Sequence, residues 1–203
     1  MAPVEQVGGD DPPLVTLPAT AYAVLGLLSF GRELSGYDIK KWADASLRHF
    51  YWAPAISHIY RELQRLEQLG LVDGHEAPQD GLRNKRMYGI TASGRAAVTA
   101  WLVDSPGEMP MLKHPVALRV WLGHLVEPDD LTHLLSAHLD RLRAEIADID
   151  ASIDGVRDDD AMRYPAAVLH WAKSIHEADL VASQNLQRSL QRSPDTARPA
   201  GAV

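Results

Sequence analysis

The sequence predicts a mainly helical protein with two parts, and three observations support this prediction. Apolar residues recur at steps of three and four in several separate stretches, which is the spacing of amphipathic helices. In the first half, a polar segment at residues 77–85 separates two short strand-like stretches, as in a hairpin. The stretch "DSPGEMPMLKHP", with three prolines and a glycine, then divides the chain, and the second half has only helical patterns.

Three helices are predicted at the start of the first half. The first lies in "LPATAYAVLGLLSFG" and ends at Gly31. The second lies in "SGYDIKKWADASL", where Ser35 and Asp38 have the spacing of a capping box. The third lies within residues 53–72, and Gly70 marks its end. Its apolar positions form one face of a helix: Ile56, Ile59, Leu63, Leu66 and Leu69.

Two strands and a fourth helix complete the first half. Leu71 and Val72 begin the first strand, "KRMYGI" is the returning strand, and Thr91 caps a helix in "ASGRAAVTAWL". The order helix, helix, helix, strand, turn, strand, helix is the order of a winged helix-turn-helix domain. We therefore predict this domain at residues 18–104, after a disordered leader at residues 1–17.

The second half is predicted to be an all-helical dimerisation domain at residues 115–190. A linker at residues 105–114 precedes it and a disordered tail at residues 191–203 follows it. Pro128 opens a long helix and Pro165 opens the last helix. Six apolar residues of the long helix alternate steps of four and three, a pattern named here the heptad seam. The heptad seam consists of Leu135, Leu139, Leu142, Ile146, Ile149 and Ile153. Such a seam is either the core of a bundle or a partner interface, and we favour a homodimer in which the last helix covers only part of it.

Composition limits the class of protein. The chain has 203 residues and a net charge of -7. Residues 18–104 hold ten basic against nine acidic residues, and residues 105–203 hold ten against fifteen. The first half can therefore still present a local basic face.

The absence of cysteine excludes disulfides and thiolate metal sites. The longest apolar run, ten residues in "AYAVLGLLSF", is half of the roughly twenty that a membrane span needs. With an acidic N-terminus unlike a signal peptide, this predicts a cytoplasmic protein without a membrane partner.

The third predicted helix has a polar face suited to DNA. Ser57, His58 and Arg61 lie in its first two turns, away from Ile59 and Leu63. The major groove admits one helix, and helix-turn-helix proteins contact bases through the start of that helix. Cations at the predicted hairpin tip could contact flanking phosphates, and they are Arg83, Lys85 and Arg86. The sequence therefore predicts double-stranded DNA as a partner.

Three ordered stretches of the chain resemble the PadR family of bacterial transcriptional regulators. They are "AVLGLLSFGRELSGYDI", "ISHIYRELQRLEQLGLV" and "RNKRMYGITASGRAAV". Their marks are the pair Gly36-Tyr37, the run Tyr60-x-x-Leu63-x-x-Leu66-Glu67 and the run Tyr88-x-Ile90-Thr91-x-x-Gly94. The resemblance is close over residues 18–102, while the rest is similar only in pattern to one subgroup. It implies a dimeric, usually repressing, ligand-responsive regulator.

The resemblance also implies which side chains contact DNA. It assigns the third helix to the major groove and the wing to the flank, with Tyr37 on a phosphate. The residues implied on the helix and wing are Ser57, His58, Tyr60, Arg61, Arg83, Lys85 and Arg86. Two alternatives stay open, since His58 could be a bystander and Tyr60 could pack against the core. Arg65 is expected to pair with Glu62 or Glu67 on the helix surface.

Other functions have less support in the sequence. A winged-helix module that binds proteins without DNA is the alternative hypothesis; it has no need of three wing cations. No assembled nucleophile, base or metal motif appears, so no enzyme, cofactor or metal is predicted. The paired histidines of the second half are five and six residues apart, off the spacing of one helix face. "DIDASIDG" departs from a calcium loop and is interpreted as the polar flank of a helix. Trp121 and Trp171 are interpreted as core, with a small-molecule effector pocket as the alternative.

Overall fold

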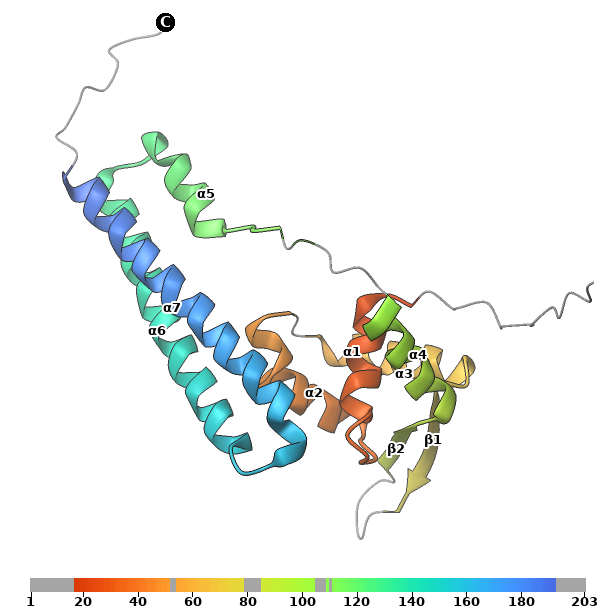
Figure 1. The fold of residues 1–203 in the computed structure, drawn as a ribbon. Helices are drawn as coiled ribbons and strands as arrows, with labels where there is room; N and C mark the ends of the chain where they lie inside the picture. Colours follow the sequence, from red (N-terminus) through yellow and green to blue (C-terminus); the bar gives the residue numbers. More distant parts are fainter. Residues whose placement is uncertain (1–16, 52–53, 79–84, 105–108, 110, 193–203) are drawn as a thin grey trace, which may run out of the picture. The chain divides into compact units, whose positions relative to one another are not determined.

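The computed structural model describes residues 17–51, 54–78, 85–104, 109 and 111–192 (Figure 1). The chain divides into two compact units. The first contains residues up to 43 and residues 53–107, and the second contains residues 44–52 and the chain from residue 108. Most of the predicted leader, part of the linker, most of the tail and the wing residue Arg83 lie outside the described residues. In the part of the chain that is described, no helix is long and apolar enough to cross a membrane.

The first unit is a winged helix-turn-helix fold, as the sequence predicts. Its elements are α1 (Ala19–Leu28), α2 (Gly36–Ala45, whose last two residues belong to the second unit), α3 (Ile56–Gln68), β1 (Val72–Ala77), β2 (Lys85–Ile90) and α4 (Ala92–Asp104). α1 is the central helix, because it contacts α3, β2 and α4. Its side chains Leu25 and Leu28 are fully buried. Gly31 and Gly70 both have positive φ angles, of 77° and 68°. Gly70 follows the C-cap Leu69 and ends α3 as expected, whereas Gly31 lies two residues after the C-cap Ser29 of α1.

α3 is strongly one-sided. Ile59, Leu63 and Leu66 have no exposed surface at all. Ile56 and Leu69, which the sequence pattern placed on the same face, are each about two-fifths exposed. They occupy the first helical residue and the C-cap of α3, where the neighbouring elements no longer cover the side chain. The buried face of α3 is therefore shorter than its apolar pattern.

The start of α4 depends on a close backbone approach at Gly94. Thr91 caps the helix as predicted, since its Oγ1 accepts a hydrogen bond from Gly94 N at 3.0 Å and donates one to Gly70 O at 2.8 Å. A Cβ atom at Gly94 would lie 2.1 Å from the backbone oxygen of Leu71. The Thr91-x-x-Gly94 run therefore joins the end of α3 to the start of α4, and only glycine fits its last position.

The wing is fixed to the start of α2 by two kinds of contact. β1 and β2 are antiparallel, and Leu34 forms an additional bridge with Tyr88 of β2. Asp38 Oδ2 accepts hydrogen bonds from Ser35 N and Oγ, which is the reciprocal half of the predicted capping box. The same oxygen accepts a hydrogen bond from Lys85 Nζ at 2.8 Å. Burial acts to raise the pKa of Asp38, but the hydrogen bonds from Lys85 and Ser35 outweigh it and lower that pKa to about 2.

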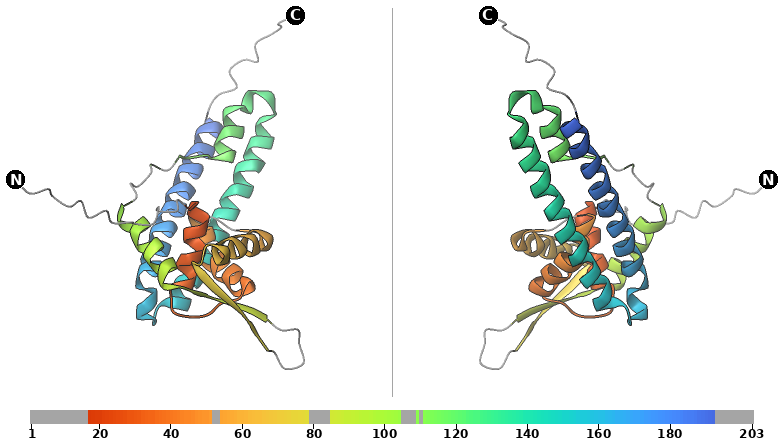
Figure 2. Two further views of the ribbon diagram at one scale, coloured as in Figure 1. Left: turned by 90° about the vertical axis from the view of Figure 1, so that its right-hand side faces the viewer. Right: turned by 90° about the vertical axis from the view of Figure 1, so that its left-hand side faces the viewer.

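The second unit is a helical hairpin with a short additional helix (Figures 1 and 2). Its elements are α5 (Pro115–Trp121), α6 (Pro128–Val156) and α7 (Arg163–Arg192), with 3-10 turns at Leu47–His49, Gly123–Leu125 and Asp160–Met162. α6 and α7 pack along each other. Five of the six residues of the heptad seam, all except Ile146, are buried within this one chain. Ile149 and Ile153 pack with Leu169 of α7 in one apolar cluster.

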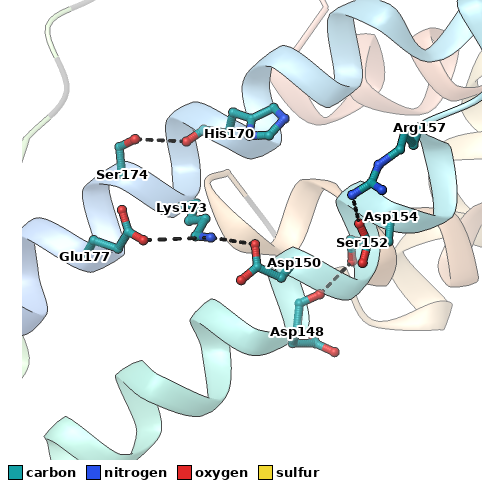
Figure 3. Close-up of polar contacts among 9 residues, drawn as sticks. All are labelled: Asp148, Asp150, Ser152, Asp154, Arg157, His170, Lys173, Ser174 and Glu177. Carbon is teal, nitrogen blue, oxygen red and sulfur yellow. Dashed lines mark hydrogen bonds and ion pairs between the residues drawn. The ribbon is translucent and has the colours of Figure 1, made fainter.

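Polar side chains line one edge of the hairpin (Figure 3). Lys173 of α7 donates a hydrogen bond to Asp150 Oδ1 of α6 at 2.7 Å. Ser152 Oγ donates to the backbone oxygen of Asp148, one turn earlier in α6. Asp148, Asp150 and Ser152 thus belong to a continuous helix, which confirms that "DIDASIDG" is a helical flank and not a calcium loop.

We predict that Gly94→Ala destabilises the first unit by about 1–3 kcal/mol, because the new Cβ would overlap a backbone oxygen that cannot move independently. Urea unfolding followed by circular dichroism measures this. Gly26→Ala in α1 is the matched control, since nothing lies within 4 Å of its Cβ position. That variant should be neutral or up to about 1 kcal/mol more stable. Equal stability of the two variants would contradict the close approach.

We predict that Asp38→Asn lowers stability at neutral pH and that the deficit disappears in acid. The folded pKa of about 2 is below the ordinary 3.8, so the charged carboxylate stabilises the fold above pH 4. That contribution is lost as the pH falls through the folded pKa. Urea unfolding at neutral pH and at a pH below the folded pKa tests the trend. Asp73→Asn, an exposed carboxylate of β1, should change stability little at either pH; a deficit for Asp38→Asn that persists in acid would refute the pairing.

Candidate nucleic-acid interface

The face of α3 opposite its buried residues presents four polar side chains. Ser57, His58, Tyr60 and Arg61 are all exposed. Among the residues that the structure describes, Arg61 makes no hydrogen bond or ion pair, so its guanidinium is available to a ligand. Arg65, one turn later, pairs with Glu62 at 3.1 Å, which confirms its expected role on the helix surface.

Tyr60 has a packing role as well as an exposed edge. A Cβ atom at Gly36 would lie 2.6 Å from Tyr60 Cε1, so the ring lies directly against the first residue of α2. Tyr60 is nevertheless 47% exposed. Tyr37, which follows Gly36 in the chain, is 67% exposed. The Gly36-Tyr37 pair and Tyr60 therefore form one surface, in which the missing Cβ of Gly36 makes room for the ring.

The wing cations have acidic partners inside the same unit. Lys85 pairs with Asp38, as described above, and Arg86 Nη2 donates a hydrogen bond to Glu67 Oε1 of α3 at 2.6 Å. Arg86 also lies 3.7 Å from Glu76 of β1. The Glu67 hydrogen bond raises the pKa of Arg86. The sequence pattern did not indicate these pairs, because Asp38 and Glu67 are 47 and 19 residues from their partners. Two of the three predicted phosphate contacts are thus already paired, and the third, Arg83, is not described.

The segment immediately before α3 is held by the second unit, of which it is part. His49 is buried, and its Nδ1 lies 2.6 Å from Glu145 Oε1 of α6. Arg48 forms ion pairs with Glu145 and Asp148. From α7, His176 Nε2 lies 3.0 Å from the backbone oxygen of His49, within hydrogen-bond distance. The 3-10 turn that leads toward α3 is therefore fixed by α6 and α7, although the sequence prediction assigned residues 44–52 to the winged domain.

An apolar face of α7 is exposed, and we name it the α7 stripe. Its members recur at steps of four and three and consist of Tyr164, Val168, Trp171, Ile175, Ala178 and Ala182. The interpretation of the second-half tryptophans as core is wrong, since Trp121 is 78% and Trp171 56% exposed. The sequence carried the signal for this stripe in its spacing, but the heptad seam of α6 has the same period and consists of leucine and isoleucine alone.

Among the described residues of the second unit, one group of side chains could hold a metal ion. His114, His138 and Asp179 of the second unit bring two imidazole nitrogens and a carboxylate oxygen within 4.8 Å of one another. The sequence prediction compared only histidines close in the chain, and His114 and His138 are too far apart for that comparison to pair them. It therefore missed this group.

Known proteins resemble this chain in sequence and in fold. The sequence pattern of the transcriptional regulator PadR-like family matches residues 24–100. The negative transcriptional regulator PadR of Bacillus subtilis is 30% identical over 133 residues, which span 66% of this chain and 72% of that protein.

Solved structures have the same fold. B. subtilis PadR in complex with operator DNA aligns with a TM-score of 0.74 at 24% identity, covering 85% of this chain and 99% of that chain. The PadR-like regulator BC1756 from Bacillus cereus aligns with a TM-score of 0.73 at 24% identity over 90% and 99% of the two chains. B. subtilis PadR in complex with p-coumaric acid aligns with a TM-score of 0.68 at 24% identity over 86% and 100%. This chain therefore belongs to the PadR-like family of transcriptional regulators, whose members are not enzymes.

Proposed function

We propose that this regulator represses transcription in the cytoplasm by binding an inverted-repeat operator as a homodimer. The observation that carries the proposal is the orientation of α3. Ile59, Leu63 and Leu66 are fully buried, so the face with Ser57, His58 and Arg61 must point to solvent. A helix held in this way can enter the major groove and form hydrogen bonds with base edges.

The proposed contacts divide into base contacts and phosphate contacts. Ser57, His58, Tyr60 and Arg61 contact bases or the adjoining backbone, and Tyr37 donates a hydrogen bond to a phosphate from the start of α2. Arg83, Lys85 and Arg86 belong to the wing. Because Lys85 and Arg86 are paired with Asp38 and Glu67, they first fix the wing beside α2 and α3. The charge that they offer to phosphate is correspondingly reduced.

The α7 stripe is the surface that we assign to the dimer. Five of the six heptad-seam residues are buried within the same chain, two of them against Leu169 of α7, so most of the seam is not available to a partner in this conformation. The α7 stripe has the spacing of a coiled-coil face and is uncovered. Packing two copies of this stripe together would bury two tryptophans, which are well suited to interface centres. A two-fold dimer can place two α3 helices about 34 Å apart, one helical turn of DNA.

A small molecule is proposed to control the regulator through the second unit. A PadR protein has been solved with p-coumaric acid. Trp121 offers an exposed aromatic wall of the kind that such a ligand needs, whereas Trp171 would line a pocket at the proposed dimer interface. Arg48 and His49, which precede α3 in the chain, contact α6 and α7, so a ligand that shifts either helix would also move this turn.

The paired cations also favour a second candidate, a winged-helix module that binds protein. Because Lys85 and Arg86 are paired with acidic side chains, the wing attracts phosphate less strongly than the sequence alone suggested. Arg61 discriminates between the two candidates, because an unpaired arginine at the start of α3 has a clear role at a guanine edge.

We predict that Arg61→Ala reduces discrimination between the operator and random DNA by about 1–3 kcal/mol, as expected for a lost base contact. The operator would be selected by the wild-type chain from random-sequence DNA, and affinities measured by fluorescence anisotropy. Arg65→Ala is the control on the same helix and should have a smaller effect, because Arg65 is paired with Glu62. Failure of the wild type to select any sequence would favour the protein-binding module. Equal weakening of both DNAs by Arg61→Ala would exclude a base contact.

We predict that Ile175→Asp converts the dimer into monomers and lowers operator affinity, because it places a charge in the centre of the α7 stripe. Val181→Asp is the matched control. Ile175 and Val181 are exposed to nearly the same extent, 52% and 54%, but Val181 lies off the stripe. Light scattering after size exclusion measures the mass. If dimers form equally well in both variants, the α7 stripe is not the interface.

A further inference from the structure

Three elements of the second unit converge on one polar group. His114 precedes α5, His138 lies in α6 and Asp179 lies in α7. His114 Nε2 is 3.1 and 3.2 Å from the two carboxylate oxygens of Asp179. His138 Nε2 is 3.5 Å from Asp179 Oδ2. The residues are 24 and 41 positions apart, so only the packing of α5 and α7 against α6 brings them together.

The separations between each imidazole Nε2 and the Asp179 carboxylate match the edges of a tetrahedral metal site, and the ligand nitrogens of the two histidines lie within 4.8 Å of each other. With ligands at 2.0–2.1 Å from a zinc ion, neighbouring ligand atoms are about 3.3 Å apart. His138 Nε2 is buried and has no hydrogen-bond partner among the residues that the structure describes. Such an atom needs a partner, and a metal ion would supply it. Ser183, itself buried, donates a hydrogen bond to Asp179 Oδ1 at 3.0 Å and so fixes the carboxylate from behind.

We propose that His114, His138 and Asp179 bind one divalent transition-metal ion of the zinc class. Two imidazoles and one carboxylate select zinc, cobalt or nickel over magnesium and calcium, which prefer oxygen ligands alone. Three protein ligands leave a fourth position open for water or a small ligand. The ion would link α5 to the α6–α7 hairpin.

The proton positions show what the ion would change. Without metal, His114 Nδ1 accepts a hydrogen bond from Ala117 N at 3.0 Å, so the proton of a neutral ring lies on Nε2, facing Asp179. A metal on Nε2 takes the lone pair there and moves the proton to Nδ1. The Ala117 amide then loses its acceptor, so metal binding requires a rearrangement in the first turn of α5.

Cobalt titration of the full-length chain tests the site. The protein, freed of any affinity tag and of metal by chelation, is titrated with Co²⁺, and the visible absorption of tetrahedral cobalt is followed. We expect one ion per chain, displaced by Zn²⁺. His138→Ala and Asp179→Asn should weaken binding on the order of 100-fold, since even outer partners of metal ligands contribute 10–100-fold. His114→Asn should weaken it too, while keeping a side-chain acceptor near the start of α5.

His133→Ala is the matched control, because His133 is an exposed histidine of α6 outside the group. It should leave cobalt affinity unchanged, and circular dichroism should show that all variants fold. No tetrahedral spectrum from the wild type would overturn the proposal. So would unchanged affinity in His138→Ala and Asp179→Asn, or an equal loss in His133→Ala. The titration contains no DNA, so its outcome is independent of the proposed repressor function.

Discussion

The burial of Ile59, Leu63 and Leu66 is the constraint on which the rest of the first unit depends. Each of these side chains contributes roughly 1.5–3 kcal/mol of gross hydrophobic stabilisation when it leaves water. Rotating α3 by one residue would expose part of this face and bury Tyr60 and Glu67, or His58 and Arg65, in its place. The helix therefore has one orientation, and the polar face follows from it. α1 supplies much of the opposing surface, which explains why it is apolar on nearly every side.

The wing shows how charge and geometry compete in one surface. Lys85 and Asp38 are each about one-third exposed, so their pair adds little stability through Coulomb attraction alone. Its larger effect is on position, because it joins Lys85 of β2 to Asp38, which forms the capping box of α2 with Ser35. Arg86 does the same for β2 and α3 through Glu67. A wing fixed in this way presents a defined shape beside α3, with a weaker electrostatic attraction to DNA than its sequence suggests.

Some apolar residues of the second unit form its core, and others remain exposed. α6 turns its heptad seam inward against α7, which gives the hairpin its core. α7 has apolar residues on two of its faces. Leu169 and Ala172 face the hairpin, while Trp171 and Ile175 remain exposed. The short turn that begins at Leu47 is attached to this hairpin and continues toward α3. The same packing also brings His114, His138 and Asp179 together at another part of the unit.

Local patterns in the sequence determined the elements and their order. Capping at Ser35 and Thr91, the positive φ angles at Gly31 and Gly70 and the three-to-four spacing in α3 all act over a few residues, so each was visible without a structure. The polar face of α3 followed for the same reason. The tertiary structure alone decided which groups meet. Lys85 with Asp38, His49 with Glu145 and His114 with Asp179 are joined across 47, 96 and 65 residues, and no local spacing encodes such pairs. Periodicity likewise identified the apolar residues of α6 and α7, but their coverage depends on which helix packs against which face.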